Sequence, residues 1–211
     1  MVSVSRRVKP DRATRRSDVR TRLLTTASQM LEEGRSFTEI TVEELITAAD
    51  VARSTFYAHF EDKGVLLLGM IEHITSEFEI AASRWYHLPV DATRQDLRDA
   101  LAILMDAYVQ HRPRLAAVME AATYDPRVRL EYEQAMDRRI AQLHHCLLTQ
   151  QRAGGLRSDV DVATVTPWLG WMVERGLFQL LASRPSTFDK QLDGMTAVLW
   201  NVLYDGARSP D

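Results

Sequence analysis

The chain has 211 residues, of which 45% are hydrophobic and 26% charged, and its formal net charge is −3. These proportions supply a buried core and exclude a chain too polar to fold. The single cysteine, Cys146, excludes an internal disulfide and fits a cytoplasmic protein, and the lack of an apolar run of about 20 residues excludes a membrane span.

The positive charge is concentrated at the N-terminus. Residues 1–22 hold eight arginines and lysines against two aspartates, so residues 23–211 are strongly acidic. A basic arm on an acidic body suggests a local contact with a polyanion such as DNA. A solvated tail that only keeps the protein in solution explains the same charges equally well. With few apolar side chains, residues 1–16 are expected to form a flexible basic arm.

Residues 17–63 are expected to form three helices. Ser17 caps the first, whose apolar side chains follow the i, i+4, i+7 stripe of a one-faced helix. Thr41 and Glu44 form a capping box ahead of a short second helix. Asp50 lies in a tight turn before a third short helix. The three helices together form the first domain.

Residues 64–211 are expected to form a larger helical domain. Asp62 caps its long first helix, and the helix that opens at Thr93 is broken before Pro113. Asp125 followed by Pro126 starts the next helix. No segment alternates as a strand would. The sequence therefore predicts an all-α protein of about nine helices, with a small N-terminal and a larger C-terminal domain.

The stretch VARSTFYAHF, residues 51–60, carries the chemistry of the N-terminal domain. At about 100° per residue, Ala52, Phe56 and Phe60 fall on one side of a helix and are expected to be buried. Arg53, Ser54 and Tyr57 point largely the other way. Two short helices with a tight turn form a helix-turn-helix, whose second helix enters the major groove. There arginine pairs with guanine, and hydroxyls reach phosphates or base edges. The alternative is a helical hairpin with a solvated face; the neighbouring basic arm favours DNA binding.

Residues 41–66 resemble the DNA-binding motif of the TetR family of bacterial regulators. The resemblance implies a ligand-responsive transcriptional regulator, most often a repressor, that binds a palindromic operator in double-stranded DNA as a homodimer. Carried over by position, it implies operator contacts from Thr41, Arg53, Ser54, Thr55, Tyr57, His59 and Lys63. Asp50 replaces the usual glycine of the turn, and its side chain tolerates the left-handed conformation. Ala52 replaces a common serine, so the third helix is expected to lack a cap.

The same resemblance implies that residues 64–211 bind a small, largely apolar effector. WMVERGLFQLLASRP followed by VLWNVLYDG resembles the ethionamide-resistance repressor subgroup of the family. That subgroup has asparagines near the positions of Gly170 and Val173, and these two residues carry no polar side chain. The polar group that holds the ligand in that subgroup is therefore not carried over. The residues expected to line the pocket are Leu97, Leu101, Met105, Tyr108, Met136, Arg139, Leu143, Trp171 and Phe178. An inward Arg139 favours an acidic ligand, whereas an outward one, the more common case, is an ordinary surface arginine.

Dimerisation is expected through the last two helices. The interface residues that we expect are Trp168, Leu199, Trp200, Leu203 and Tyr204. A dimer also follows from DNA geometry, because two recognition helices about one helical turn apart read a palindrome. The alternative is that these side chains belong to the core of one subunit.

No metal, cofactor or enzymatic function is expected. His144, His145 and Cys146 are consecutive, so on a helix they diverge by about 100° each and cannot share a metal. The sequence has no nucleophile elbow, phosphate-binding loop or dinucleotide fingerprint. The competing hypothesis is a helical enzyme or carrier of an apolar metabolite, with the first 64 residues as an interaction module. It predicts no salt-dependent DNA affinity.

Overall fold

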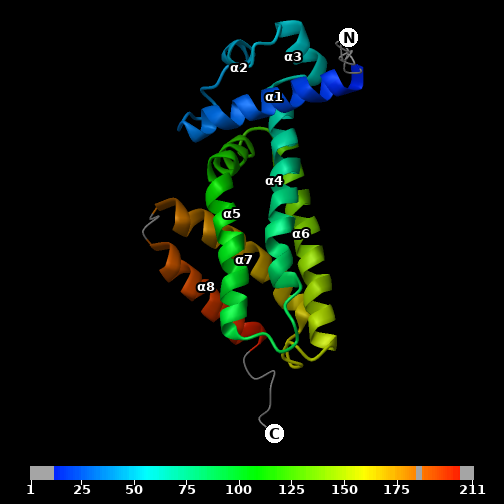
Figure 1. The fold of residues 1–211 in the computed structure, drawn as a ribbon, viewed down its shortest axis with the longest axis vertical. Coiled ribbons are helices and arrows are strands. Elements are labelled where there is room, and N and C mark those ends of the chain that lie inside the picture. Colours follow the sequence, from blue (N-terminus) through cyan, green and yellow to red (C-terminus); the bar gives the residue numbers. More distant parts are fainter. Residues whose placement is uncertain (1–11, 184–186, 205–211) are drawn as a thin grey trace, which may run out of the picture.

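The computed structural model describes residues 12–183 and 187–204, with side chains from 18 to 180 and from 187 to 204 (Figure 1). These residues form eight α-helices and no strand, which confirms the all-α class. The helices are α1 (Arg12–Glu32), α2 (Val42–Ala48), α3 (Arg53–His59), α4 (Lys63–Tyr86), α5 (Arg94–Ala121), α6 (Pro126–Arg152), α7 (Val162–Ser183) and α8 (Phe188–Leu203).

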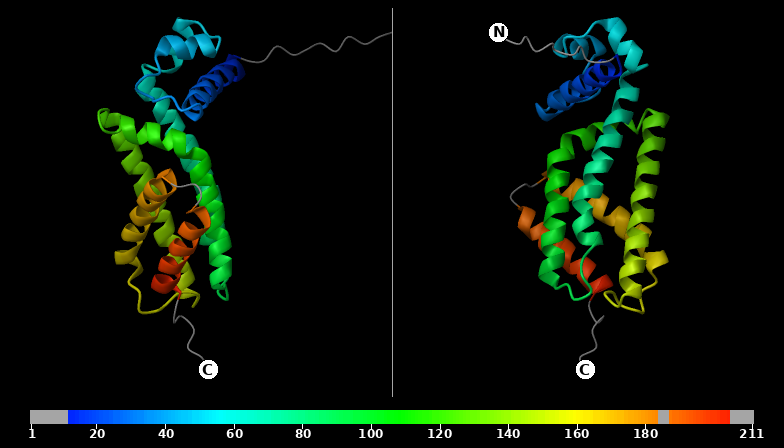
Figure 2. Two further views of the ribbon diagram at one scale, coloured as in Figure 1. Left: turned by 90° about the vertical axis from the view of Figure 1, so that its left-hand side faces the viewer. Right: turned by 45° about the vertical axis from the view of Figure 1, so that its right-hand side comes forward.

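The break predicted at Pro113 is wrong, which explains eight helices rather than about nine. Pro113 lies inside α5, and Figure 2 shows that this helix bends in its C-terminal part. A proline removes one backbone hydrogen bond and crowds the preceding turn, which kinks a helix without having to end it. His111 and Leu115, on either side of the proline, are both buried. Packing on both sides therefore keeps α5 continuous.

The predicted start of the first helix at Ser17 is also wrong, because α1 begins at Arg12. Residues 12–16 hold three arginines and an alanine, which are good helix formers. Leu23 and Ala27 are fully buried and anchor the helix, so extending it backward requires no new nucleation. The rest of the expected basic arm, residues 1–11, lies outside the described residues.

Helices α1–α3 and the first turn of α4 form a compact unit, here called the head. Its core is built from Leu23, Phe37, Leu45, Phe56 and Phe60, each at most 2% exposed. Figure 1 shows α1 lying crosswise below α2 and α3 and above the other helices, while α4 runs from the head toward the opposite end of the molecule. Any movement of α4 is therefore transmitted directly to the head.

The caps of the head follow the sequence predictions. Thr41 and Glu44 form the capping box, and the backbone N–H and hydroxyl of Thr41 together with Arg35 lower the pKa of Glu44 to about 2. Asp50 has a φ of 50°, which confirms the left-handed turn. Ala52 gives α3 no side-chain cap, as predicted, whereas Asp62 accepts the Val65 amide and caps α4.

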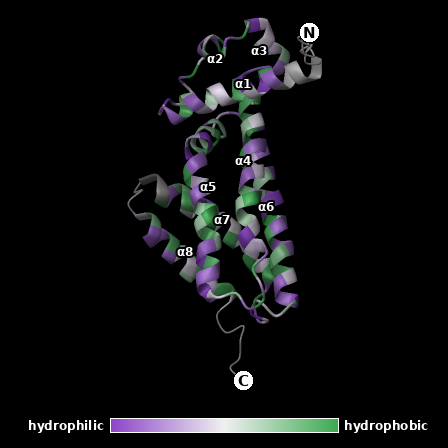
Figure 3. Ribbon diagram, in the orientation of Figure 1, coloured by the Kyte–Doolittle hydropathy of each residue, from purple (hydrophilic) through white to green (hydrophobic). Residues whose placement is uncertain are grey.

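Helices α4–α8, below the head, form the body. α4, α5 and α6 run roughly along its length, and α7 and α8 lie side by side on one face (Figure 2). The body helices alternate hydrophobic and hydrophilic residues (Figure 3), as expected where one face of each helix is buried. Within the described ranges, no helix is both long enough and apolar enough to cross a bilayer.

Candidate DNA-binding face and effector cavity

The recognition helix α3 has the orientation that the sequence predicts. Phe56 is fully buried and Phe60 nearly so, while Arg53, Ser54 and Tyr57 are exposed. Ala52, expected on the buried side, is exposed, because it precedes the first turn of α3. Thr55 and His59 are half-buried beside them. The phenylalanine side of α3 thus fixes the helix in the head, and the opposite side is free to meet a duplex. That these side chains contact DNA stays a prediction.

Arg53 and Tyr57 lie together on the exposed face. The guanidinium of Arg53 lies 5.8 Å from the centroid of the Tyr57 ring and 3.0 Å from a carboxylate oxygen of Glu43 on α2. The side chains of Arg53 and Glu43 are 66% and 67% exposed. An ion pair this exposed stabilises by at most about 1 kcal/mol. Arg53 is therefore ordered, yet it can exchange Glu43 for a guanine or a phosphate at little cost.

Thr41, an expected operator contact, makes its hydrogen bonds within the protein. Its backbone N–H and its hydroxyl both donate to Glu44 Oε2, each at 2.8 Å. The hydroxyl oxygen in turn accepts the Glu44 amide at 3.2 Å. The only hydroxyl proton is thus used, and the Glu44 carboxylate beside it repels a phosphate. Thr41 acts as the cap of α2.

Lys63 was expected to pair with the DNA backbone, but its ammonium points into the head. It donates to the carbonyl oxygens of Phe37, Thr38 and Ile40 at 2.9, 3.0 and 3.1 Å. An ammonium has three protons, and this arrangement uses all of them. Burial lowers the pKa of Lys63, opposed by the nearby Glu120 carboxylate. Lys63 therefore fixes the α1–α2 loop to the start of α4.

Replacing Lys63 by methionine is expected to lower the free energy of unfolding by about 2–3 kcal/mol, because three carbonyls lose a charged donor. Urea unfolding followed by circular dichroism measures this change. The matched control is Lys190→Met on α8, whose exposed position predicts a change within about 0.5 kcal/mol. Equal stability of the two variants would show that Lys63 does not hold the loop.

Polar contacts join the head to the body. Ser36 donates to Glu120 Oε1 at 3.1 Å, and Thr38 donates to the same oxygen. Arg127, in the first turn of α6, donates to Asp62 Oδ2 at 2.8 Å. Partial burial of Asp62 raises the pKa of its carboxyl group. The hydrogen bonds from Arg127 and the Val65 amide lower it by more, so the pKa of Asp62 lies below its usual value. The body thus contacts both the loop before α2 and the cap of α4.

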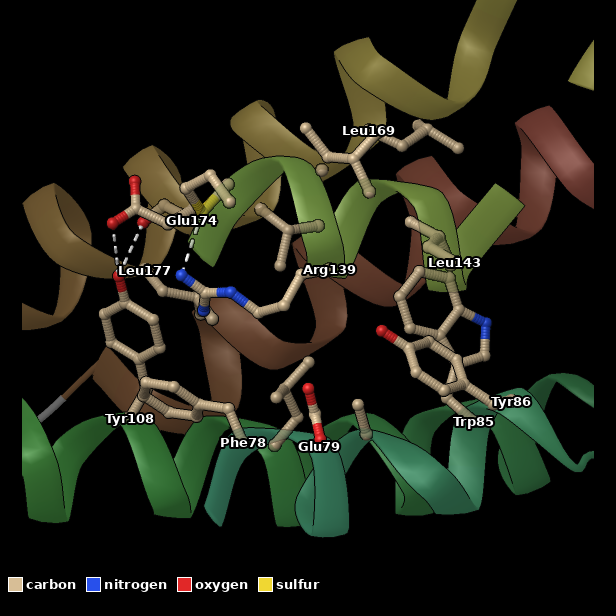
Figure 4. Close-up of a pocket in the computed structure, with 16 residues that line it drawn as sticks. Phe78, Glu79, Trp85, Tyr86, Tyr108, Arg139, Leu143, Leu169, Glu174 and Leu177 are labelled. Atoms are coloured by element: carbon tan, nitrogen blue, oxygen red, sulfur yellow. Dashed lines mark hydrogen bonds between the residues drawn. The ribbon is translucent and has the colours of Figure 1, made fainter. Parts of the chain in front are cut away.

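A cavity of about 70 Å³ lies within the body, between α4, α5, α6 and α7 (Figure 4). Its lining is mainly apolar and aromatic, with a small number of polar groups, as in many small-molecule sites. The residues are Phe78, Glu79, Ala82, Trp85, Tyr86, Leu104, Tyr108, Met136, Arg139, Ile140, Leu143, Leu169, Gly170, Val173, Glu174 and Leu177. The cavity adjoins the same α4 that enters the head.

Four of the predicted pocket residues line this cavity: Tyr108, Met136, Arg139 and Leu143. The other five do not. Leu97, Leu101 and Met105 are fully buried in the core, and Trp171 and Phe178 are half-buried outside the lining. Helical periodicity predicts which side of α5 and α7 is buried, but not the level along the helices at which a cavity opens. These five residues therefore lie outside this cavity.

The sequence analysis missed the contribution of α4. Phe78, Ala82 and Trp85 lie at the i, i+4, i+7 spacing of one helix face and form one wall of the cavity. That spacing is visible in the sequence, but it indicates only a buried face, and a cavity needs neighbouring helices that fail to fill it. Gly170 contributes to the opposite wall, where a Cβ would lie 2.7 Å from Ile140 Cγ1.

A buried carboxylate closes one end of the cavity. Glu174, on α7, is 4% exposed and accepts the hydroxyl groups of Tyr108 at 2.9 Å and Tyr132 at 2.5 Å through Oε1. Burial and, second, the Glu174 charge raise the pKa of both tyrosines. Glu174 Oε2 has no hydrogen-bond partner and lies 3.7 Å from Arg175 Nε. The tyrosines are therefore fixed hydrogen-bond donors.

Arg139 points into the cavity, which decides the alternative that its sequence position left open. In Figure 4 its guanidinium lies above Phe78 and extends toward the end where Tyr108 and Glu174 meet. Nη2 lies 2.9 Å from Met136 Sδ, and the guanidinium carbon is 5.5 Å from the Phe78 ring centroid. Nε is buried without a hydrogen-bond partner.

Most of the residues predicted at the dimer interface belong to the core of the subunit. Leu199 and Leu203 are fully buried, and the buried Tyr204 hydroxyl accepts from Trp85 and donates to Gln150. Trp200 is half-buried and stacks on Tyr204 with ring centroids 5.1 Å apart. The face of α8 that looked suited to a partner therefore packs onto the subunit's own helices.

Trp168, on α7, is the exception among the predicted interface residues, because 78% of it is exposed. Met172, one turn further along α7, is also exposed, as are Leu180 and Val198. These four residues are here called the α7–α8 apolar patch. Exposed apolar patches are typical of protein–protein interfaces, so α7 and α8 remain candidates for dimerisation through side chains other than those predicted.

Comparison with known proteins agrees with this architecture. Residues 23–70 match the family described as "Bacterial regulatory proteins, tetR family". The chain is 25% identical over 188 residues to the "HTH-type transcriptional regulator EthR" of Mycolicibacterium smegmatis, covering 86% of this chain and 84% of that protein. Salmonella enterica GusR superimposes with a TM-score of 0.68 at 19% identity, covering 88% of this chain and 95% of that one.

A third relative is known with a small molecule. A transcriptional regulator from Saccharomonospora viridis, solved in complex with choline, superimposes with a TM-score of 0.68 at 17% identity. The match covers 89% of this chain and 98% of that one. The family resemblance and the subgroup resemblance drawn from the sequence are both confirmed by these matches.

Proposed function

We propose that this chain, whose residues 23–70 match the TetR family, is a DNA-binding transcriptional regulator and, more specifically, a homodimeric repressor released from a palindromic operator by a small molecule. The observation that carries the proposal is the orientation of α3, whose phenylalanines are buried while Arg53 and Tyr57 are exposed. The proposal includes a cytoplasmic location, since a repressor has to reach its operator DNA.

The reading face of the proposed regulator consists of Arg53, Ser54, Thr55, Tyr57 and His59. Arg53 supplies the bidentate donor that distinguishes guanine in the major groove. The hydroxyl groups of Ser54 and Tyr57 position the helix on phosphates or base edges. Thr41 and Lys63 are left out of this set because their donors are used inside the head.

The cavity is the proposed effector site, and its small size supports coupling to DNA binding. Small-molecule sites usually enclose about 300–1,000 Å³, and the 70 Å³ of this cavity is far less. An effector of ordinary size therefore has to displace side chains or separate helices as it enters. Helix α4 forms one wall of the cavity and begins in the head. At a rise of 1.5 Å per residue, the start of α4 lies about 22 Å along the helix from Phe78. Displacing α4 changes the position of the recognition helix.

The experiment that tests this function is a gel shift with the DNA upstream of the protein's own reading frame, run at two salt concentrations. Arg53→Ala and Tyr57→Ala are each expected to weaken specific binding by about 10-fold to 100-fold, because each removes a contact of about 1–3 kcal/mol. Wild-type affinity should fall as salt rises, as it does for any protein that displaces counterions from DNA.

Arg84→Ala, an exposed arginine in the last turn of α4 and distant from the head, is the matched control and should bind as the wild type does. Thermal unfolding of all three variants checks that the fold is intact. Undiminished operator affinity in both Arg53→Ala and Tyr57→Ala would contradict the assignment of the reading face. Absence of any salt-dependent DNA binding would favour an enzyme or carrier instead.

A further inference from the structure

The cavity contains one cationic group whose hydrogen bonds are unsatisfied. A guanidinium has five N–H donors and no acceptor. Arg139 offers only Nη2 to a thioether, Met136 Sδ, and sets its face above the Phe78 ring. A thioether is a weak acceptor, and Nε is buried with no acceptor at all. Within the described residues, no carboxylate lies within ion-pair distance of Arg139.

Arg139 is half-buried, and holding its guanidinium in this state is costly because the charge loses part of its water and gains no strong partner. The long stem explains part of the burial, since its methylene groups pack on apolar neighbours. It does not explain why the head group turns inward. Arg138, the next residue, points out and donates to Glu131 at 2.8 Å. The helix α6 thus offers a solvated alternative one residue away.

We propose that the effector is a small organic acid, whose carboxylate binds the Arg139 guanidinium while its aromatic or aliphatic part fills the apolar end of the cavity. This inference rests on the proposed effector site. Guanidinium and carboxylate match in geometry and form paired, charge-assisted hydrogen bonds. The apolar end is formed by Trp85, Tyr86 and Leu143, away from Glu174 in Figure 4.

A cationic effector paired with Glu174 is the competing possibility. The Glu174 carboxylate, however, already accepts two tyrosine hydroxyls through Oε1, and Arg175 lies 3.7 Å from Oε2. Arg139 therefore lacks partners more severely than Glu174 does. An ammonium in the cavity would also meet the positive charge of Arg139. Glu79 lines the cavity too, but it is exposed to solvent.

The carboxylate would also act on α4. Pairing with an anion draws the guanidinium away from the Phe78 ring, and Phe78 belongs to the α4 wall. Arg139 then gives up its contact with the thioether of Met136 and donates stronger hydrogen bonds to the carboxylate. Charge recognition and displacement of α4 are thus connected through one side chain, which links the head group of the effector to the position of the recognition helix.

The test is isothermal titration of the full chain with three matched sets of probes. The acids are phenylacetate, benzoate and octanoate, each paired with its amide and with an amine of similar size. We expect at least one acid to bind about 10-fold or more tighter than its amide, because a charge-assisted hydrogen bond is stronger than a neutral one by about this factor. The amines are expected not to bind. Tighter binding of an amine would overturn the proposal in favour of Glu174.

Arg139→Met and Arg139→Lys separate charge from shape. Arg139→Met should lose the acid affinity about 10-fold to 100-fold while amide affinity is unchanged, and Arg139→Lys should restore part of it. Arg138→Met is the matched control and should bind as the wild type does, since Arg138 is on the surface. Equal loss of acid and amide in Arg139→Met, or unchanged acid affinity, contradicts the inference, as does failure of every acid to bind.

The gel shift distinguishes failure of this inference from failure of the proposed function. Operator affinity is measured without any probe for the wild type and for the surface control Arg138→Met, and the two should be equal. If the operator is bound but no acid is, the chain is a DNA-binding regulator with another kind of effector. If the operator is not bound, the proposed function fails first.

Discussion

Trp168→Arg is expected to convert the proposed dimer into monomers and to lower operator affinity by about 100-fold or more. Trp168 is 78% exposed and lies with Met172, Leu180 and Val198 in the α7–α8 apolar patch. If these side chains form the interface, an arginine in place of Trp168 puts an unpaired charge away from water. The two heads then lose the fixed spacing of roughly 34–36 Å that lets them read both half-sites together.

The measurement for Trp168→Arg combines light scattering, which gives the mass in solution, with a gel shift at constant salt. Ile80→Arg is the control, because Ile80 is equally apolar and exposed but lies on α4 rather than on α7 or α8. The control should remain a dimer. If Trp168→Arg stays dimeric, or if Ile80→Arg dissociates as well, the interface lies elsewhere and the dimer geometry proposed for this protein is wrong.

Phe56→Ala is expected to destabilise the head by about 3–5 kcal/mol and to abolish specific DNA binding. Phe56 is fully buried, and its ring lies 5.3 Å from Tyr57 and 5.8 Å from Phe60, centroid to centroid. Helix α3 has seven residues and no side-chain cap, so it is too short to persist without its anchors. Removing Phe56 therefore removes the helix that presents Arg53.

Circular dichroism during urea unfolding and titration with the probe acids together test Phe56→Ala. The body does not depend on Phe56, so binding in the cavity should persist while the gel shift is lost. Phe56→Leu is the control, because it keeps most of the buried volume and should cost less than about 1.5 kcal/mol. A Phe56→Ala variant with unchanged stability would mean that α3 is held in place by other contacts.

The sequence determined the local structure of this protein with good accuracy. Caps, turns and buried faces depend on residues within about four positions of one another, and these distances are read directly from the chain. The capping box of Thr41, the left-handed Asp50 and the inward phenylalanines of α3 were predicted correctly for this reason. The motif in residues 41–66 predicted the helix-turn-helix for the same reason, because its residues are neighbours in the sequence.

The tertiary structure decided every feature that depends on contacts between distant segments. The ammonium of Lys63 binds carbonyls more than 20 positions away, a pairing that no local pattern indicates. Pro113 remains inside α5 because packing outweighs the missing hydrogen bond. Periodicity shows which side of α6, α7 and α8 is buried, but not which neighbour covers it. Packing between helices therefore determined that Arg139 enters the cavity, that Leu199 is core and that Trp168 is exposed.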